Sequence, residues 1–111
     1  MKIIKVNLLE KETEYNFMPT LTGYILDGDP NEKELRPAVV IMPGGAYRGV
    51  TYREGERVAL SYSSAGFHAF ILDYCVTPHT EPLPILNAAK AIELIRANAD
   101  EWSVDPDKIA V

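Results

Sequence analysis

A short buried strand that runs straight into a two-glycine loop limits the fold of this chain more than any other feature. Residues 37–42 are apolar and rich in β-branched side chains, a pattern typical of a strand covered on both faces, as in a parallel sheet. Pro43-Gly44-Gly45-Ala46-Tyr47 follows, and a helix is predicted soon after, because Thr51-Tyr52-Arg53-Glu54 has the spacing of a capping box. Glycines allow close approach to backbone N–H groups, so the pattern predicts an α/β fold with a site at this loop.

Composition narrows the class of protein further. The 111 residues are 47% hydrophobic with a net charge of −5 and no run of Lys or Arg, which argues against nucleic acid or a membrane as partner. Cys75 is the single cysteine, so no disulfide forms within one chain, and we interpret it as a buried apolar residue. No apolar run suits a signal peptide or a membrane span, which leads us to expect a cytoplasmic protein.

The remaining pattern alternates between strands and helices. Residues 3–8 and 20–26 are expected to pair antiparallel at a sheet edge, and residues 67–74 are expected to form the next buried strand. A helix is predicted over residues 85–102, and Asp105-Pro106-Asp107 is predicted to break the chain before a third buried strand begins at Ile109. Because a central strand needs about five or six residues, we expect residues 1–111 to be the N-terminal part of one domain.

Two segments resemble the α/β-hydrolase family, in particular its esterase and lipase members of the acetyl-esterase and acetylxylan-esterase type. Residues 43–47 resemble the HGGG oxyanion loop, with Pro43 at the histidine position and Ala46 in place of the third glycine. Residues 102–111 resemble the segment that precedes the G-x-S-x-G nucleophile elbow. The resemblance implies the N-terminal portion of an α/β-hydrolase fold: a mostly parallel sheet with an antiparallel N-terminal edge and flanking helices.

The same resemblance implies a serine-type carboxylic ester hydrolase and gives roles to individual residues. The backbone N–H groups of Gly45 and Ala46 would stabilise an oxyanion, with Gly44 shaping the loop, and each such donor is typically worth about 10²–10³ in rate. Tyr47 would wall the substrate pocket, or else be ordinary packing. The catalytic Ser, acid and His would lie beyond Val111, so the chain alone is expected to be inactive. The implied substrate is a small short-acyl ester, with an acetylated sugar as a candidate; no cofactor is implied, and a homo-oligomer is allowed.

Other nucleophilic and titratable residues fit the site less well. His68, at a strand start, is interpreted as structural, whereas His79 lies in a proline-rich loop on the expected ligand side and is a candidate for substrate contact. Ser61, Ser63 and Ser64 fall in the first helix without a glycine elbow and are rejected as nucleophiles. The histidines and the cysteine show no paired spacing, so no metal site is predicted.

Two further hypotheses remain open. In one, the chain is an α/β domain that binds a phosphate or nucleotide, because a glycine loop ahead of a helix can hold phosphate oxygens. Neither a G-x-G-x-x-G pattern nor a P-loop lysine supports this hypothesis. In the other, the chain is a non-catalytic fragment that depends on a partner to cover an exposed sheet edge.

Overall fold

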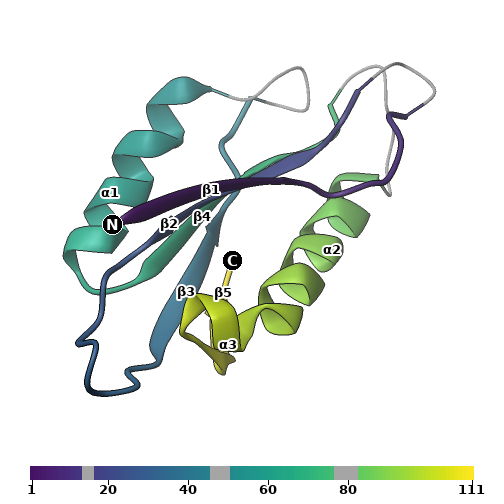
Figure 1. Cartoon of the computed structure of the whole chain (residues 1–111). Coiled ribbons are helices and arrows are strands. Elements are labelled where there is room, and N and C mark those ends of the chain that lie inside the picture. The colour runs from purple at the N-terminus through teal and green to yellow at the C-terminus, as the bar shows by residue number, and fades with distance from the viewer. Residues whose placement is uncertain (14–16, 46–50, 77–82) are drawn as a thin grey trace.

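A five-stranded mixed sheet with helices on both faces makes up the structure, a computed structural model that describes residues 1–13, 17–45, 51–76 and 83–111 (Figure 1). The elements in chain order are β1 (Lys2–Asn7), β2 (Thr20–Ile25), β3 (Arg36–Ile41), η1 (Tyr52–Glu54), α1 (Glu56–Ser64), β4 (His68–Asp73), α2 (Leu83–Ala97), α3 (Ala99–Trp102) and β5 (Val104–Ala110).

The strand order in the sheet is β1-β2-β4-β3-β5. β1 pairs antiparallel with β2, and β2 pairs antiparallel with β4. β3 lies between β4 and β5 and is parallel to both. The predicted class is confirmed, since a parallel portion is joined to an antiparallel pair at the N-terminal edge.

Helices cover the two faces of the sheet separately, with α1 on one face and α2 and α3 on the other (Figure 1). The core beneath α2 and α3 contains Phe70, Leu72, Ile95 and Trp102, and Phe70 packs on Trp102 with 5.6 Å between ring centroids. A smaller cluster beneath α1 is built around Ala59 and Ala69. In the described ranges, no helix is long and apolar enough to cross a membrane.

The burial of β3 and β4 confirms the prediction of two interior strands. The last four residues of β3 are buried, and so are most residues of β4, because each strand has neighbours on both sides and a helix layer on both faces. Since β3 and β4 are parallel, the segments that follow them leave the sheet at the same edge. The two-glycine loop, which follows β3, therefore lies next to Tyr74 and Cys75, which follow β4.

The prediction for the last strand was wrong in its start and in its burial. β5 begins at Val104 and includes the Asp105-Pro106-Asp107 segment that was expected to break the chain. Its pairing with β3 is irregular between Arg36 and Ala38, and most of its residues are exposed. A proline is tolerated in a strand at a sheet edge or at a bulge, because its missing N–H then breaks no ladder hydrogen bond.

The first helix also begins later than the sequence indicates. Residues 52–54 form the short 3₁₀ turn η1, and α1 starts at Glu56 after Gly55, which provides no side-chain cap. The predicted stop is confirmed, since Gly66 adopts φ +95° and donates its N–H to the Ser63 carbonyl at 3.0 Å. The second predicted helix is interrupted at Asn98, which separates α2 from α3.

Candidate functional site

The two-glycine loop borders a hollow of about 490 Å³ on the α2 side of the sheet. Its lining comes from the end of β3, the end of β4 and the first turns of α2: Met42, Gly44, Gly45, Tyr74, Pro84, Ile85 and Ala88. The lining is mostly apolar, and Ile85 is 61% exposed although it is a large hydrophobic residue. A mostly apolar hollow with a few polar backbone groups is the usual form of a small-molecule site.

The peptide groups on both sides of Gly44 are hydrogen-bonded to residues outside the loop. The Gly44 N–H donates to Glu54 Oε2 at 3.3 Å, and the Gly44 carbonyl accepts from the Thr51 N–H at 2.9 Å. The Pro43 carbonyl accepts a hydrogen bond from the Tyr74 hydroxyl at 2.5 Å. Because the peptide groups before and after Gly44 are both hydrogen-bonded, the direction of the backbone from Gly44 to Gly45 is fixed.

These contacts correct the capping-box prediction. Thr51 Oγ1 accepts from the Arg53 N–H at 3.3 Å, and the Glu54 carboxylate accepts from Gly44 rather than from Thr51. The spacing of Thr51 and Glu54 fits a capping box, but the Glu54 carboxylate accepts a hydrogen bond from the glycine loop and not from the Thr51 N–H. Glu54 thus belongs to the surroundings of the loop, a role that sequence reasoning missed.

The neighbouring strand end is anchored to α2 by a buried amide. The Cys75 N–H donates to Asn87 Oδ1 at 2.8 Å, and the Asn87 residue is only 4% exposed. A buried side-chain acceptor that satisfies a backbone N–H fixes the spacing of strand and helix. Tyr74, which borders the hollow, therefore leaves β4 from a well-defined position.

Of the residues assigned to the site from the sequence, the structure describes two. Gly45 is exposed and lines the hollow, and within the described residues its N–H has no hydrogen-bond partner. Gly44 lies beside it, with both of its peptide groups occupied as above. Ala46, Tyr47 and His79 lie outside the described residues.

His68 is a structural residue, as predicted. It is fully buried; its Nδ1 accepts from the Leu26 N–H at 3.0 Å, and its Nε2 lies 3.0 Å from the Ser103 carbonyl, to which it donates. These partners define the neutral tautomer with the proton on Nε2. Burial lowers the pKa of His68, partly opposed by the hydrogen bond to Ser103.

A second hollow, of about 330 Å³, lies on the α1 side and holds the titratable side chains Lys5, Tyr24, Glu56 and Asp73. The Tyr24 hydroxyl donates to Glu56 Oε2 at 3.2 Å, and burial together with this carboxylate raises the pKa of Tyr24. Burial also raises the pKa of Asp73, an effect that the charge of Lys5 partly offsets. No residue of this group contacts the described part of the glycine loop through a hydrogen bond.

The serines of α1 lie on the face of the sheet away from the glycine hollow. Ser61 Oγ donates to the Arg57 carbonyl at 3.1 Å and Ser64 Oγ donates to the Ser61 carbonyl at 2.9 Å. Ser63 is buried against the sheet, and its hydroxyl has no partner in the part of the chain that the structure describes. None of them lines the glycine hollow, consistent with their rejection as nucleophiles.

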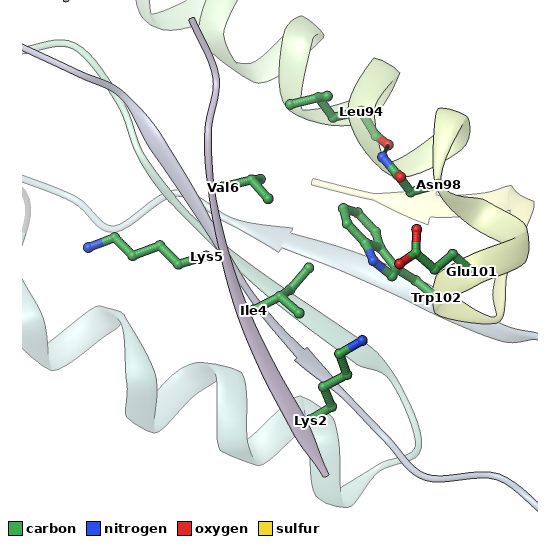
Figure 2. A pocket seen from close by; sticks show the side chains of 8 residues that line it. All are labelled: Lys2, Ile4, Lys5, Val6, Leu94, Asn98, Glu101 and Trp102. Carbon is green, nitrogen blue, oxygen red and sulfur yellow. Dashed lines mark hydrogen bonds between the residues drawn. The ribbon is translucent and has the colours of Figure 1, made fainter. Parts of the chain in front are cut away.

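A further hollow of about 410 Å³ opens between β1 and the helices α2 and α3 (Figure 2). Figure 2 shows Lys2, Ile4 and Val6 on the side of Trp102, while Lys5 points away. The hollow reaches Trp102, which precedes β5 and so lies at the end of the sheet opposite the glycine loop. Among the described residues, no group of His, Cys, Asp or Glu is arranged to hold a metal ion.

Two comparisons with known proteins found similar sequences and structures, whereas no family model matches the chain. A curated relative, endo-1,4-beta-xylanase B of Butyrivibrio fibrisolvens, is 30% identical over 106 residues, which are 90% of this chain and 16% of that protein. The solved α/β hydrolase MGS-M1 from a deep-sea metagenome library is 37% identical with a TM-score of 0.89, over 100% of this chain and 45% of that one.

A second solved structure is similar over nearly the whole chain. The acetyl ester-xyloside bifunctional hydrolase of Caldicellulosiruptor lactoaceticus is 33% identical with a TM-score of 0.84, over 96% of this chain and 40% of that one. The chain thus spans less than half the length of the proteins it matches. In sequence and in structure, it is similar to the esterase-type α/β hydrolases and has the N-terminal part of their fold.

Proposed function

We propose that this chain carries the oxyanion-hole half of a serine-type carboxylic ester hydrolase that acts on short-acyl esters. Supporting the proposal is the position of Gly45 at the carboxyl end of β3, where it lines the glycine hollow beside a Gly44 whose peptide groups are both held. The similarity to esterase-type hydrolases supports the same activity for the whole protein.

In the proposed mechanism, the chain contributes backbone donors and an apolar wall. When a serine attacks the ester carbonyl, the carbonyl oxygen gains negative charge, which the N–H groups of Gly45 and Ala46 stabilise. The acyl or alcohol group of the ester packs against Met42, Tyr74 and Ile85 in the hollow. The serine, its histidine base and the acidic residue come from sequence beyond Val111, so the chain alone is expected to be inactive.

An acetylated carbohydrate is the proposed substrate class. The similarity to an acetyl ester-xyloside hydrolase at 33% identity supports this choice. A hollow of about 490 Å³ suits a small acyl group together with part of a sugar. We place the protein in the cytoplasm, as expected from the sequence.

The proposal is tested on the full-length protein that contains this chain. We expect hydrolysis of p-nitrophenyl acetate to be faster than that of the octanoate, release of acetate from acetylated xylo-oligosaccharides, and covalent labelling by a fluorophosphonate. Residues 1–111 alone are expected to show none of these. A thermal shift with inorganic phosphate or nucleotides, without any ester hydrolysis, would support the phosphate-binding hypothesis instead.

A proline at position 45 tests the oxyanion role directly, because it removes the N–H. We expect Gly45→Pro to lower kcat about 10²–10³-fold, the usual loss for one oxyanion donor. Gly28→Ala is the control, since Gly28 is exposed and an added Cβ there would have no atom within 4 Å. A Gly45→Pro protein that unfolds at the wild-type temperature and keeps kcat within threefold would exclude this donor.

A further inference from the structure

One short turn of the chain contacts the peptide groups on both sides of Gly44. Thr51 and Glu54 are linked through the Glu54 N–H and the Thr51 carbonyl at 3.2 Å. From this turn, the Glu54 carboxylate accepts from the Gly44 N–H and the Thr51 N–H donates to the Gly44 carbonyl. The turn is therefore built to hold Gly44, and not to cap α1.

The contact with the Gly44 carbonyl has a consequence for the next N–H group. The Gly44 carbonyl and the Gly45 N–H belong to one planar peptide group, and in a trans peptide they point in opposite directions. The Thr51 N–H draws the carbonyl toward the turn, so the Gly45 N–H points away from it. Gly45 lines the glycine hollow, which is where an oxyanion would form under the proposed function.

The preceding peptide group is fixed from both of its ends. Its carbonyl, on Pro43, accepts from the Tyr74 hydroxyl, and its N–H, on Gly44, donates to Glu54. Rotation of this peptide group would break both contacts. Tyr74 belongs to the neighbouring strand end, so the Glu54 carboxylate is the contact that the turn itself contributes.

A side chain at position 44 would have to displace this carboxylate. A Cβ on residue 44 would lie 3.0 Å from Glu54 Oε1 and 3.1 Å from Glu54 Oε2, tighter than nine in ten real Cβ contacts. Among the described glycines, only Gly66 has a positive φ, so the backbone at position 44 accepts an alanine. The obstacle to a side chain at position 44 is therefore Glu54 itself.

From these contacts we infer that Glu54 is a positioning residue: its carboxylate holds Gly44 so that the Gly45 N–H faces the substrate carbonyl. The inference rests on the proposed function, because it names what orients the donor of that reaction. Glu54 does not touch the substrate. Its contact is exposed to solvent and 3.3 Å long, so its loss is expected to cost less than loss of the donor itself.

The experiment compares five variants of the full-length protein by kcat and KM for p-nitrophenyl acetate and by unfolding temperature. We expect Glu54→Ala to lower kcat about tenfold, a fraction of the effect of a missing donor, with KM within twofold of wild type. Glu54→Gln keeps an acceptor oxygen and is expected to retain at least a third of wild-type kcat. Glu101→Ala, which removes an exposed glutamate from α3, is the matched control and is expected to leave kcat unchanged.

Gly44→Ala and the double variant Gly44→Ala/Glu54→Ala complete the cycle. If an alanine at position 44 acts by displacing the Glu54 carboxylate, Gly44→Ala lowers kcat about tenfold in wild type and less than twofold in the Glu54→Ala background. Independent effects would instead multiply to about a hundredfold. Non-additivity of this kind, together with rescue by glutamine, separates positioning from a general loss of folded protein.

The outcomes separate the inference from the proposed function. If the wild-type protein hydrolyses the ester while Glu54→Ala and Glu101→Ala have the same kcat, the role of Glu54 is overturned and the proposed function stands. Multiplicative loss in the double variant also overturns it. If the full-length wild-type protein neither hydrolyses esters nor reacts with a fluorophosphonate, the proposed function itself fails.

Discussion

Replacing His68 with leucine is the sharpest test of how the central sheet is held together. The imidazole is fully buried and joins two backbone groups that are distant in sequence, the Leu26 N–H and the Ser103 carbonyl. Leu26 follows β2, and Ser103 precedes β5. His68 therefore fastens the antiparallel part of the sheet to the entry of the last strand.

The cost of the substitution follows from those two partners. Each buried backbone group that loses its partner costs about 1–3 kcal/mol, so His68→Leu is expected to lower the free energy of unfolding by about 2–5 kcal/mol. This loss is a large fraction of the 5–15 kcal/mol that stabilises a typical domain. We expect the unfolding temperature to fall by at least about 10 °C.

The effect of His68→Leu is also expected to depend on pH. Burial lowers the pKa of His68 in the folded protein, so the native state keeps it neutral below pH 6.5, where the unfolded chain takes up a proton. The stabilisation is fully present above about pH 6.5 and decreases as the pH falls through the folded pKa. The leucine variant lacks this titration, so the difference between the two proteins is expected to shrink under acid conditions.

Urea denaturation at pH 8 and at pH 5 measures both effects. Other titrating groups are common to the two proteins and cancel in the difference. Lys33→Ala is the control, because it breaks only an exposed ion pair in which Lys33 Nζ lies 3.0 Å from Asp100 Oδ1. We expect it to lower the free energy of unfolding by less than about 1 kcal/mol. A His68→Leu penalty below 1 kcal/mol at pH 8, or one that is the same at pH 5, would refute the structural role given to His68.

Three further predictions concern packing and the strand ends. A Cβ on Gly23 would lie 2.7 Å from the buried Phe70 ring, so Gly23→Ala is expected to lower the free energy of unfolding by about 1–3 kcal/mol in urea denaturation. Adding Phe70→Leu to the Gly23→Ala chain is expected to restore part of the lost free energy, because the smaller side chain makes room for the Cβ. Tyr74→Phe removes the donor to the Pro43 carbonyl and is expected to cost about 1 kcal/mol in the same assay; an unchanged midpoint would contradict the contact. Cys75 is fully buried, and burial raises the pKa of its thiol. We therefore expect the thiol to react with a disulfide reagent only in denaturant. Rapid reaction of the native protein would contradict the buried position of Cys75.

Much of the fold was predictable because the local pattern and the tertiary environment agree. The apolar run before the glycine loop predicted an interior strand, and β3 is interior because it lies between β4 and β5. The polar segments between the early strands predicted an antiparallel pair, and β1 and β2 form it. Gly66 was expected to end a helix and does so with a positive φ.

The failed predictions are those in which a distant partner overrides a local signal. Asp105-Pro106-Asp107 has the composition of a turn, and the Asp107 N–H does donate to Asp105 Oδ1 at 3.0 Å, yet the strand continues because Val104 and Ile109 on either side pair with β3 around a bulge that tolerates the proline. Thr51 and Glu54 have capping-box spacing, yet the carboxylate binds Gly44, ten residues earlier in the chain. No local pattern indicates that contact, because it depends on how Glu54 of η1 is placed against Gly44 in the folded chain.

By itself, the sequence determined the class of the fold, the order of its elements and the place where a ligand-binding loop would lie, since periodicity and glycine chemistry are local properties. Only the tertiary structure decided what surrounds that loop. Tyr74 reaches the loop because the parallel strands β3 and β4 end at the same side of the sheet, Glu54 reaches Gly44 from η1, and Asn87 of α2 holds Cys75 next to Tyr74. Their hydrogen bonds are specific to this packing, and residue spacing along the chain does not encode them.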